Sequence, residues 1–533
     1  MDLQRSIFIF GFFFISFLVW EIWKSSTHFY SNQLSSQHHN VNLINRYNKN
    51  NILIKTDVLL LKVNLRGGDI EQAQLLNFKD KLDSFKPLIL LDTKNNFIYQ
   101  TRSGLIRQNS LDNWDPETRH VYVVKKKYFE LKKYQEELHV PLTWTSSEGI
   151  TYVKTFIFKP NSYDIEIRYK IYNGTDKELE ISMFGGLRQT IAIPDNKSIN
   201  NDNFSLQTFR GIAYSTDNNK YEKYQFDSVL QQKNLNIVTH RGWIAMLQQY
   251  FVTAWIPNHT QLNTFYTNKI NEDVVEVGFH SNKMHIKPYD QIICNSKLWI
   301  GPEIQEKMAM LAPNLDLTVD YGWLWFLSQP LFKLLKILYN LVGNWGLSII
   351  LITFIIRGLT YPLTKSQYKT MFKMKKLKPK IDRIKQNYKH NRKKMSEEML
   401  ALYQHEKVNP LGGCLPLLVQ MPIFLALYYM LISSVELRHA PFILWIKDLS
   451  DQDPYYVLPV LMGITMFFVQ RITPNDISDP IQKNIMHIVP MIFTIFFLWF
   501  PSGLVLYYVV SNLVTIIQQK FISDYFKDIN KLV

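Results

Sequence analysis

Cysteine is scarce in this sequence, and the residue groupings typical of catalysis and metal binding are missing. The 533 residues include two cysteines, Cys294 in a polar region and Cys414 in an apolar one, so a disulfide framework is not expected. No cysteine or histidine group has metal-ligand spacing, and no glycine-rich phosphate-binding loop occurs. These absences predict a protein that is not an enzyme and that needs no cofactor.

The mean hydropathy of −0.12 combines two unlike regions. Residues 24–320 are polar, whereas residues 341–519 contain long apolar runs with few internal charges. The net charge is +15, which is typical of proteins that bind nucleic acid or an anionic membrane surface. The position of the basic residues along the chain therefore has to decide between these partners.

The first residues predict a membrane anchor. Residues 7–20 form an uncharged apolar run behind Arg5, and no small-residue cleavage site follows it. We therefore expect an uncleaved transmembrane signal anchor at residues 1–23, with a cleaved signal peptide as the alternative. Residues 24–50 are rich in Ser, Asn and His and predict a flexible linker.

Residues 51–318 have the alternation of β-strands. Between 163 and 171 every second residue is apolar: Tyr163, Ile165, Ile167, Tyr169 and Ile171. Asn173-Gly174 follows as a hairpin signal, and the alternation resumes at Leu179. This pattern predicts a large antiparallel β-sandwich. Its histidines are scattered, so a binding or docking module is expected there.

Residues 319–340 predict an amphipathic helix at the outer membrane interface. Leu331, Leu334, Leu335 and Leu338 share one helical face, and Trp323 and Trp325 precede them. The alternative is a helix packed on the sandwich.

Residues 341–519 predict five transmembrane helices, at 341–363, 412–435, 454–470, 488–500 and 504–519. The last two come from one uncharged run, 488–519, which is long for one span and short for two. Pro501 and Gly503 are expected to break it into two short helices, which would thin the membrane locally. The alternative is one tilted helix with a proline kink.

The charged loops give the orientation. Residues 364–411 hold fourteen basic and four acidic residues, so this loop is expected in the cytoplasm, and the acidic loop 436–453 outside. Both termini, including the tail 520–533, then lie in the cytoplasm. Met371, Met374, Leu377, Ile381 and Ile384, and then Met395, Met399 and Leu402, predict a hairpin of two amphipathic helices joined at residues 389–392. Its basic faces suit anionic lipid or ribosomal RNA, although a simple solvated loop would have the same charge.

Arg357 is the residue of greatest functional interest. A charge within an apolar span is costly and commonly marks a functional pathway. Thr353 lies one turn above it, and other spans carry polar residues that would converge on it: Gln420, Tyr507, Tyr508, Ser511 and Asn512. The alternatives are an arginine that snorkels to the headgroups and ordinary polar contacts between helices.

Short motifs across the apolar region resemble one family. They are Asn344-Trp345-Gly346, Ile356-Arg357-Gly358, Tyr361-Pro362-Leu363-Thr364-Lys365, Asn409-Pro410-Leu411-Gly412-Gly413-Cys414, Gln420-Met421-Pro422-Ile423-Phe424, Asp453-Pro454-Tyr455-Tyr456 and Pro501-Ser502-Gly503-Leu504. Together they resemble the YidC insertases, relatives of the mitochondrial Oxa and chloroplast Alb proteins. The resemblance is dense over residues 343–519 and looser across the sandwich.

The resemblance implies a polytopic α-helical protein of the bacterial inner membrane. It would have six transmembrane helices, a large periplasmic antiparallel β-sandwich domain and a cytoplasmic helical hairpin. A groove open to cytoplasm and lipid would use Arg357 for polar segments and Met421 and Phe424 for apolar ones. Implied partners are nascent membrane proteins, the Sec translocon, and ribosomes or targeting factors at the hairpin.

Two other functions remain open from the residues alone. A solute transporter or channel also uses intramembrane arginines, but no inverted repeat is found. A membrane-anchored periplasmic carbohydrate-binding protein would use the sandwich, and would need a site that the sequence does not locate.

Overall fold

The computed structural model describes residues 50–93, 97–107, 119–191, 209–389, 391–406, 408, 415–473 and 480–531. The predicted anchor, all of the predicted linker except Asn50, and Cys414 lie outside these residues. The described chain divides into a β-rich unit that ends at Asp320 and a helical unit that begins at Tyr321.

The β-rich unit consists mainly of strands, with one small helical segment between β12 and β13 and two after β19. The strands are β1 (Asn51–Lys55), β2 (Leu59–Asn64), β3 (Asp69–Lys79), β4 (Pro87–Leu91), β5 (Tyr99–Arg107), β6 (Tyr128–Glu130), β7 (Leu138–Thr145), β8 (Thr151–Phe158), β9 (Asp164–Tyr172), β10 (Leu179–Thr190), β11 (Gly211–Ser215), β12 (Glu222–Tyr224), β13 (Asn236–Thr239), β14 (Trp243–Gln248), β15 (Phe251–Pro257), β16 (Asn263–Lys269), β17 (Val274–Ser281), β18 (Met284–Ile286) and β19 (Gln291–Pro302). The helical segments are α2 (Phe226–Leu230), α3 (Gln305–Leu311) and η3 (Leu315–Thr318).

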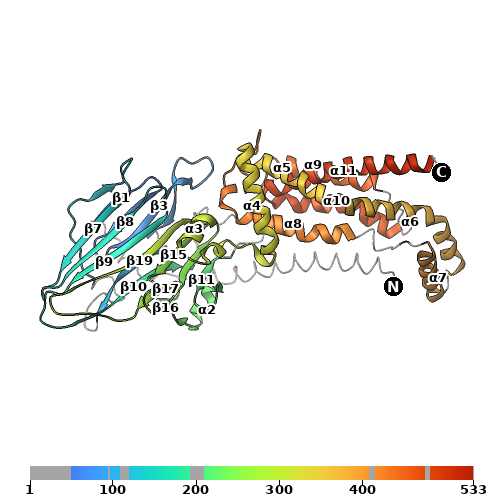
Figure 1. Ribbon diagram of the computed structural model, residues 1–533. Coiled ribbons are helices and arrows are strands. Elements are labelled where there is room, and N and C mark those ends of the chain that lie inside the picture. Colours follow the sequence, from blue (N-terminus) through green and yellow to red (C-terminus); the bar gives the residue numbers. More distant parts are fainter. Residues whose placement is uncertain are drawn as a thin grey trace. The chain divides into compact units, whose positions relative to one another are not determined.

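The strands of the described residues form two sheets (Figure 1). One has the order β13-β16-β17-β10-β5-β3-β2-β1-β6, with β18 paired to β10 and β4 to β3; the other has the order β12-β11-β14-β15-β19-β9-β8-β7. Pairing is antiparallel apart from β1 with β6. In β9, Ile165, Ile167, Tyr169 and Ile171 are all buried, as their alternation requires. The predicted antiparallel sandwich is confirmed.

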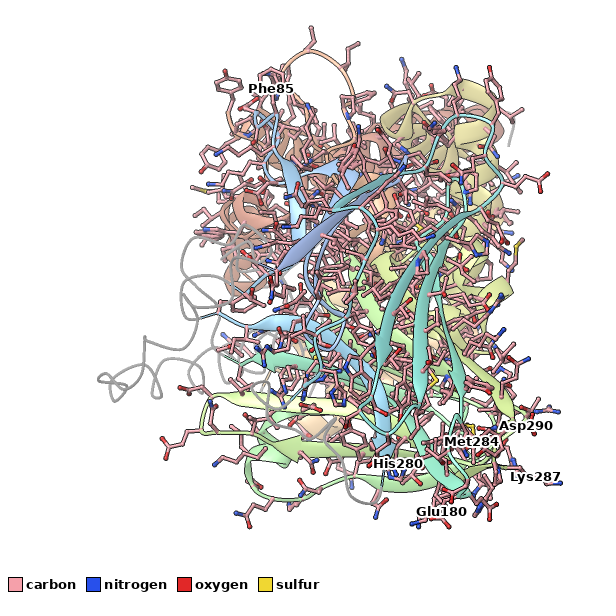
Figure 2. All side chains as sticks on the ribbon, turned by 90° about the vertical axis from the view of Figure 1, so that its left-hand side faces the viewer. Phe85, Glu180, His280, Met284, Lys287 and Asp290 are labelled. Atoms are coloured by element: carbon pink, nitrogen blue, oxygen red, sulfur yellow. The ribbon has the colours of Figure 1, made fainter. Side chains whose placement is uncertain are left out.

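The predicted hairpin at Asn173-Gly174 is wrong. Strand β9 pairs with β8 and β19 in one sheet, whereas β10 pairs with β5 and β17 in the other, so the chain crosses between sheets here. Asn173 is fully buried, and its side-chain amide donates to the carbonyls of Lys177, Ile286 and Lys287. Figure 2 shows Lys287 at the same end of the sandwich as Glu180 of β10. The Asn173 oxygen accepts from the Thr175 amide in a local turn, so the asparagine joins this turn to the distant carbonyls and does not close a two-residue hairpin.

The two sheets approach closely at a glycine pair in β10. The indole nitrogen of Trp255, on β15, donates to the Gly186 carbonyl at 3.2 Å. A side chain at Gly185 would place its Cβ 2.6 Å from the Phe279 ring and 2.7 Å from the Trp255 ring. Glycine is therefore required where these two aromatic rings pack on the strand.

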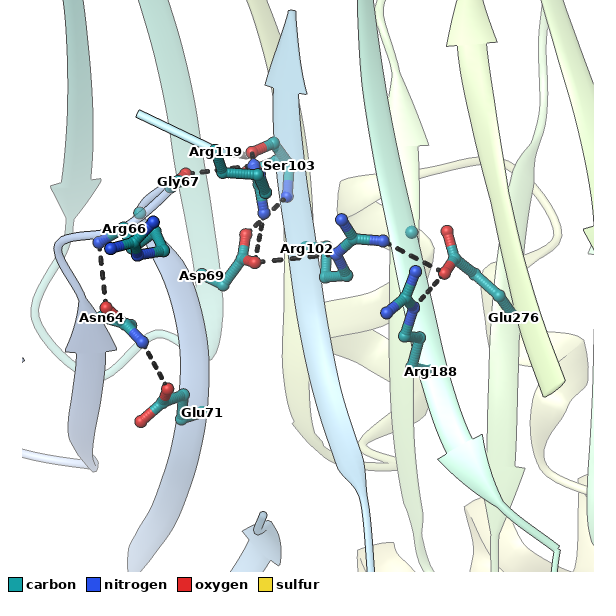
Figure 3. Close-up of polar contacts among 12 residues, drawn as sticks. Asn64, Arg66, Gly67, Asp69, Glu71, Arg102, Ser103, Arg119, Arg188 and Glu276 are labelled. Atoms are coloured by element: carbon teal, nitrogen blue, oxygen red, sulfur yellow. Dashed lines mark hydrogen bonds and ion pairs between the residues drawn. The ribbon is translucent and has the colours of Figure 1, made fainter. Parts of the chain in front are cut away.

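A buried ion-pair network joins four strands of the larger sheet (Figure 3). Arg102 on β5 lies 3.6 Å from the Asp69 carboxylate on β3 and 3.3 Å from the Glu276 carboxylate on β17. Arg119 pairs with Asp69, and Arg188 on β10 pairs with Glu276. Burial raises the pKa of Asp69, but Arg119, Arg102 and Lys154 outweigh it and hold the pKa below its ordinary value. Asp69 therefore contributes stability at neutral pH that is lost as the pH falls through this lowered pKa.

The helical unit contains helices of very different lengths. Its elements are η4 (Gly322–Leu324), α4 (Trp325–Val342), α5 (Trp345–Leu359), α6 (Tyr361–Asn387), α7 (Arg392–His405), α8 (Leu415–Ser433), η6 (Val435–Leu437), α9 (Val457–Ile472), α10 (Pro480–Phe496), η7 (Phe497–Trp499) and α11 (Ser502–Lys531). Helix α11 packs against α5 and α9, and α9 packs against α10 (Figure 1).

Helix α4 corresponds to the predicted interfacial helix, with boundaries shifted to Trp325–Val342. Its buried face contains Phe332, Leu335 and Leu338, and it packs on α5 and α8. The Ser328 hydroxyl donates to the Ala426 carbonyl of α8 at 2.9 Å. Gly343, with a φ of 70°, ends the helix, and the Asn344 side chain accepts from Leu347 N to begin α5.

Few of the described helices reach the length of a membrane span. The segment Ser502–Asp524 is long and apolar enough, and α5 with α6 would be a second if this pair, bent by 56°, is one span. Shorter apolar helices are Val419–Ser433, Val457–Ile472 and Ile488–Trp499. The count of six spans therefore remains a prediction.

The final apolar run breaks at Pro501. The prediction that the helix after this break is short is wrong. Helix α11 continues to Lys531, beyond the predicted end at residue 519. The charged residues after Gln519 mark the end of an apolar segment, but neither proline nor glycine follows to end the helix. The 23 residues of Ser502–Asp524 extend about 34 Å, which is enough to cross a bilayer core of about 30 Å.

The basic loop forms a helical hairpin of unequal arms. Helix α6 begins at Tyr361, directly after the bend, and runs to Asn387; α7 follows after the turn near Asn391. Leu377, Ile381 and Val408 form its small buried cluster, against which Met374, Leu402 and Tyr403 pack. The predicted apolar faces of the two arms therefore do meet.

The ion-pair network gives a test of the sandwich. Replacing Glu276 with Gln removes the carboxylate between Arg102 and Arg188, and we expect the free energy of unfolding to fall by about 3–5 kcal/mol, as for other broken buried pairs. Denaturant titration of the full chain, followed by the circular dichroism of the strands, measures this. Glu272→Gln, at an exposed site before β17, is the control and should change stability by less than about 0.5 kcal/mol. Equal losses in the two variants would contradict the role of the network.

Candidate functional site

Arg357 lies in the last turn of α5, close to the bend into α6. Its guanidinium donates from Nε to the Ser511 hydroxyl of α11 at 2.7 Å, and Nη2 donates to the same oxygen. Within the described residues, no carboxylate forms an ion pair with Arg357. A positive charge between apolar helices is thus bound by a neutral hydroxyl.

A small cavity lies beside the arginine, where α5, α6, α8 and α11 meet. It measures about 20 Å³, room for roughly one water molecule. Its lining residues are Ile356, Arg357, Thr360, Leu363, Thr364, Val419, Gln420, Ile423 and Tyr507. Tyr507 is 2% exposed, whereas Val419 is 40% exposed, so the α8 side is the more accessible.

The structure brings together four of the seven polar residues selected from the sequence. Arg357, Gln420 and Tyr507 line the cavity, and Ser511 binds the guanidinium. The other three point elsewhere. Thr353 is fully buried and its hydroxyl donates to the Ile349 carbonyl of its own helix at 2.6 Å. Asn512 donates to the Thr465 hydroxyl of α9 at 3.1 Å.

Tyr508 belongs to an aromatic cluster that also contains Phe424. The rings of Tyr508 and Phe424 lie 5.2 Å apart, and Tyr508 also lies 5.1 Å from Phe497. Phe424 is half-buried by these contacts, and Met421, one turn before it on α8, is half-buried as well. The cluster joins α8 to α11 and η7, and the predicted substrate contacts of Met421 and Phe424 remain predictions.

Sequence reasoning missed a polar group near the backbone of Arg357, towards the C-terminal end of α11. The Gln518 side chain donates to the Arg357 carbonyl at 3.1 Å, and Gln519 donates to the Thr473 hydroxyl at the end of α9 at 2.9 Å. Gln518 lies seven residues after Ser511, about two helical turns, and so shares its face. The seven-residue spacing of Ser511 and Gln518 was the sequence feature that could have indicated that both residues face Arg357.

The opposite end of α11 is held by the acidic loop before α9. The Ser502 amide donates to the Asp451 carbonyl at 2.7 Å, and the Gly503 amide to the Leu449 carbonyl at 2.9 Å. Buried Asp453 accepts from the Leu458 amide at the start of α9 and from the Trp445 indole. The first amides of α11 are thus satisfied by the chain itself.

Metal binding has no support in the part of the chain that the structure describes. No group of three or more His, Cys, Asp or Glu side chains is placed to hold an ion there. The chemistry of the Arg357 site is therefore that of a cation, hydroxyls and amides, which recognise polar and acidic groups by hydrogen bonds and charge.

Family models match both units of the chain. The model described as YidC periplasmic domain matches residues 51–334, and the model described as 60Kd inner membrane protein matches residues 337–529.

Full-length relatives are also highly similar. The membrane protein insertase YidC of Buchnera aphidicola subsp. Baizongia pistaciae (strain Bp) is 59% identical over 531 residues, covering 98% of each chain. Its counterpart from Buchnera aphidicola subsp. Schizaphis graminum (strain Sg) is 56% identical over 532 residues, covering 99% of each. A solved structure, the active YidC insertase with its first transmembrane domain resolved, is 19% identical with a TM-score of 0.37, covering 88% of this chain and 92% of that one. The chain belongs to the YidC family of membrane protein insertases.

Proposed function

We propose that this insertase uses Arg357 as a transient partner for the polar and acidic segments of proteins entering the membrane. Its family acts in membrane protein insertion in the inner membrane, with the β-sandwich domain in the periplasm, and is not a family of enzymes. Its substrates are newly made membrane proteins. Family membership favours this function over a solute transporter, a channel or a carbohydrate-binding protein.

The contact between Arg357 and Ser511 is the observation that supports this proposal. A carboxylate of an incoming chain would replace or join a neutral hydroxyl at the guanidinium, and the contact in which both groups are charged is the stronger of the two. The energy of placing an acidic tail near hydrocarbon would fall while the contact lasts. The arginine therefore favours acidic and polar tails over apolar ones.

Apolar segments would leave the groove into lipid by hydrophobic burial. This supplies about 0.8 kcal/mol per buried CH₂ group, so a transmembrane segment needs no other energy source once its polar tail has crossed. Met421 and Phe424 on α8, with Tyr508 and Phe497 behind them, offer an apolar wall next to the polar cavity. A segment that passes between this apolar wall and the polar cavity would contact an apolar surface on one side and a polar surface on the other.

The finer architecture is part of the same proposal. Six spans would leave both termini and the hairpin in the cytoplasm and the loop 436–453 in the periplasm, as the charges favour. The groove would open to cytoplasm and lipid. The hairpin would receive ribosomes, targeting factors and anionic lipids, and the groove would act alone or with the Sec translocon.

Substitution of Arg357 tests the mechanism. Insertion of a substrate with an acidic translocated tail should fall about tenfold or more in Arg357→Ala, since a hydrogen bond to a charged group is lost. A neutral-tailed version of the same substrate should change little, and Arg357→Lys should retain much of the activity because it keeps the charge. Insertion of the acidic-tailed and neutral-tailed substrates into proteoliposomes, assayed in parallel, measures this difference.

The control for Arg357 is Arg471→Ala, an exposed arginine in the last turn of α9. It should leave both substrates unaffected. A defect in Arg357→Ala that is the same for acidic and neutral tails would reject the proposed role.

The hairpin is expected to be mobile and necessary for substrate capture. Its buried cluster is small, so backbone amides of α6 and α7 should exchange hydrogen faster than those of α11. Replacing residues 374–405 with a short linker should abolish insertion while keeping Thr364 at the cavity. Lys380→Ala, which breaks the exposed pair with Glu406, should have no effect. Full activity without the hairpin, or strong protection of it, would refute this.

The sandwich is expected to be dispensable for insertion. It is a separate compact unit, and its buried Arg102, Arg188 and Glu276 pair with one another. A chain lacking residues 55–310 but keeping α4 should insert substrates in cells depleted of the native protein. Failure of this chain despite normal membrane levels would show that the sandwich takes part in insertion.

A further inference from the structure

We infer that Gln518 is a positioning residue that sets the place of Arg357 in the groove; the inference deepens the proposed function and rests on it. Helix α11 holds Arg357 at two points. Ser511 binds the guanidinium, and Gln518, two turns further along the same face, binds the backbone carbonyl of the same residue at 3.1 Å.

The carbonyl of Arg357 needs such a partner because of the bend. The last four carbonyls of α5 have no amide partners within that helix. The Ile356 carbonyl accepts from the Thr360 amide at 3.0 Å, and α6 leaves α5 at 56° after Thr360. The Thr360 hydroxyl approaches the Arg357 carbonyl at only 3.4 Å, a long contact. The Gln518 amide is the closer donor, so it fixes the backbone of Arg357 at the point where the chain changes direction.

The orientation of the Gln518 amide supports this role. With its nitrogen directed at the Arg357 carbonyl, the Gln518 oxygen is buried and has no hydrogen-bond partner among the described residues. An unpaired buried acceptor costs stability, and an apolar side chain at this position would avoid the cost. The hydrogen bond from Gln518 to the Arg357 carbonyl offsets this cost.

The fixed backbone would decide what the guanidinium can reach. An arginine side chain is long and flexible, and a free backbone at the bend would let it move towards the cytoplasmic headgroups. Held at carbonyl and guanidinium, Arg357 stays beside Gln420 and Tyr507 at the cavity. Gln518 would thereby preserve the preference for acidic tails without contacting the substrate itself.

Gln519 provides a matched control. It is the neighbouring residue with the same side chain, it is buried, and its oxygen is also unpaired. Its amide, however, donates to Thr473 on α9 and not to Arg357. Gln518→Leu and Gln519→Leu therefore make the same chemical change at sites that differ in their partner.

The first experiment observes the arginine directly. In the full chain in lipid nanodiscs, the ¹⁵N signal of the Arg357 Nε–H, assigned with Arg357→Lys, reports its hydrogen bond and mobility. We expect both Gln518→Leu and Ser511→Ala to broaden or shift this signal, and Gln519→Leu to leave it unchanged. A signal that is unaltered by Gln518→Leu would overturn the inference, whatever the insertion assays give.

The second experiment measures the selectivity of insertion. Gln518→Leu should lower insertion of an acidic-tailed substrate about threefold to tenfold, as expected for one lost hydrogen bond, and should leave its neutral-tailed version unchanged. In an Arg357→Ala background the same substitution should have no further effect. An equal loss of insertion for both tails would show that Gln518 only holds the helices together. An undiminished effect of Gln518→Leu in the Arg357→Ala background would show the same.

The two experiments separate the inference from the proposed function. If the insertion defect of Arg357→Ala is the same for acidic and neutral tails but Gln518→Leu still releases the guanidinium, the proposed function fails and the positioning role stands. If the insertion defect of Arg357→Ala is larger for acidic tails but Gln518→Leu changes neither the Arg357 signal nor the selectivity, only the positioning role fails.

Discussion

The arrangement of the helical unit depends on one constraint, which is that a guanidinium at the end of an apolar helix must have polar partners. Leaving it bare near hydrocarbon would cost at least several kcal/mol. Helix α11 supplies a hydroxyl for the side chain and an amide for the backbone of Arg357. Both come from one face of an unbroken helix, so α11 has to remain regular from Ser511 to Gln518, and the break at Pro501 has to lie before this segment.

The two ends of α11 solve different problems. At the end that begins with Ser502, the amides of Ser502 and Gly503 donate to carbonyls of the loop before α9, in which Asp453 binds the first turn of α9. These first amides of α11 therefore have partners within the described chain. At the other end the charge of Arg357 meets a neutral partner, and a small cavity adjoins it. One end of α11 is therefore closed by hydrogen bonds of the chain itself, and the other adjoins a cavity beside a cation. Under the proposed function, substrates would enter at the Arg357 end.

The sequence predicted those features that depend on local patterns. Strand alternation at Ile165, Ile167 and Ile171 identified the sandwich, and the rarity of polar residues in apolar spans selected both Arg357 and Ser511. Features that depend on how elements face one another were not predictable. Asn512 is adjacent to Ser511 but is turned by about 100° towards α9. Asn173-Gly174 has the composition of a hairpin, yet the buried carbonyls that Asn173 binds come from a distant turn.

The arginines of the two units show why the partner of Arg357 is a hydroxyl. In the sandwich, Arg102 and Arg188 share the Glu276 carboxylate, and such a pair is permanent because separating it leaves buried charges uncompensated. An acidic residue at position 511 would bind Arg357 in the same way and occupy the charge that an incoming tail needs. Serine satisfies the geometry of the guanidinium without neutralising it. Under the proposed function, this interaction would hold the side chain at the cavity and would yield to a carboxylate, so that the binding of an acidic tail would be reversible.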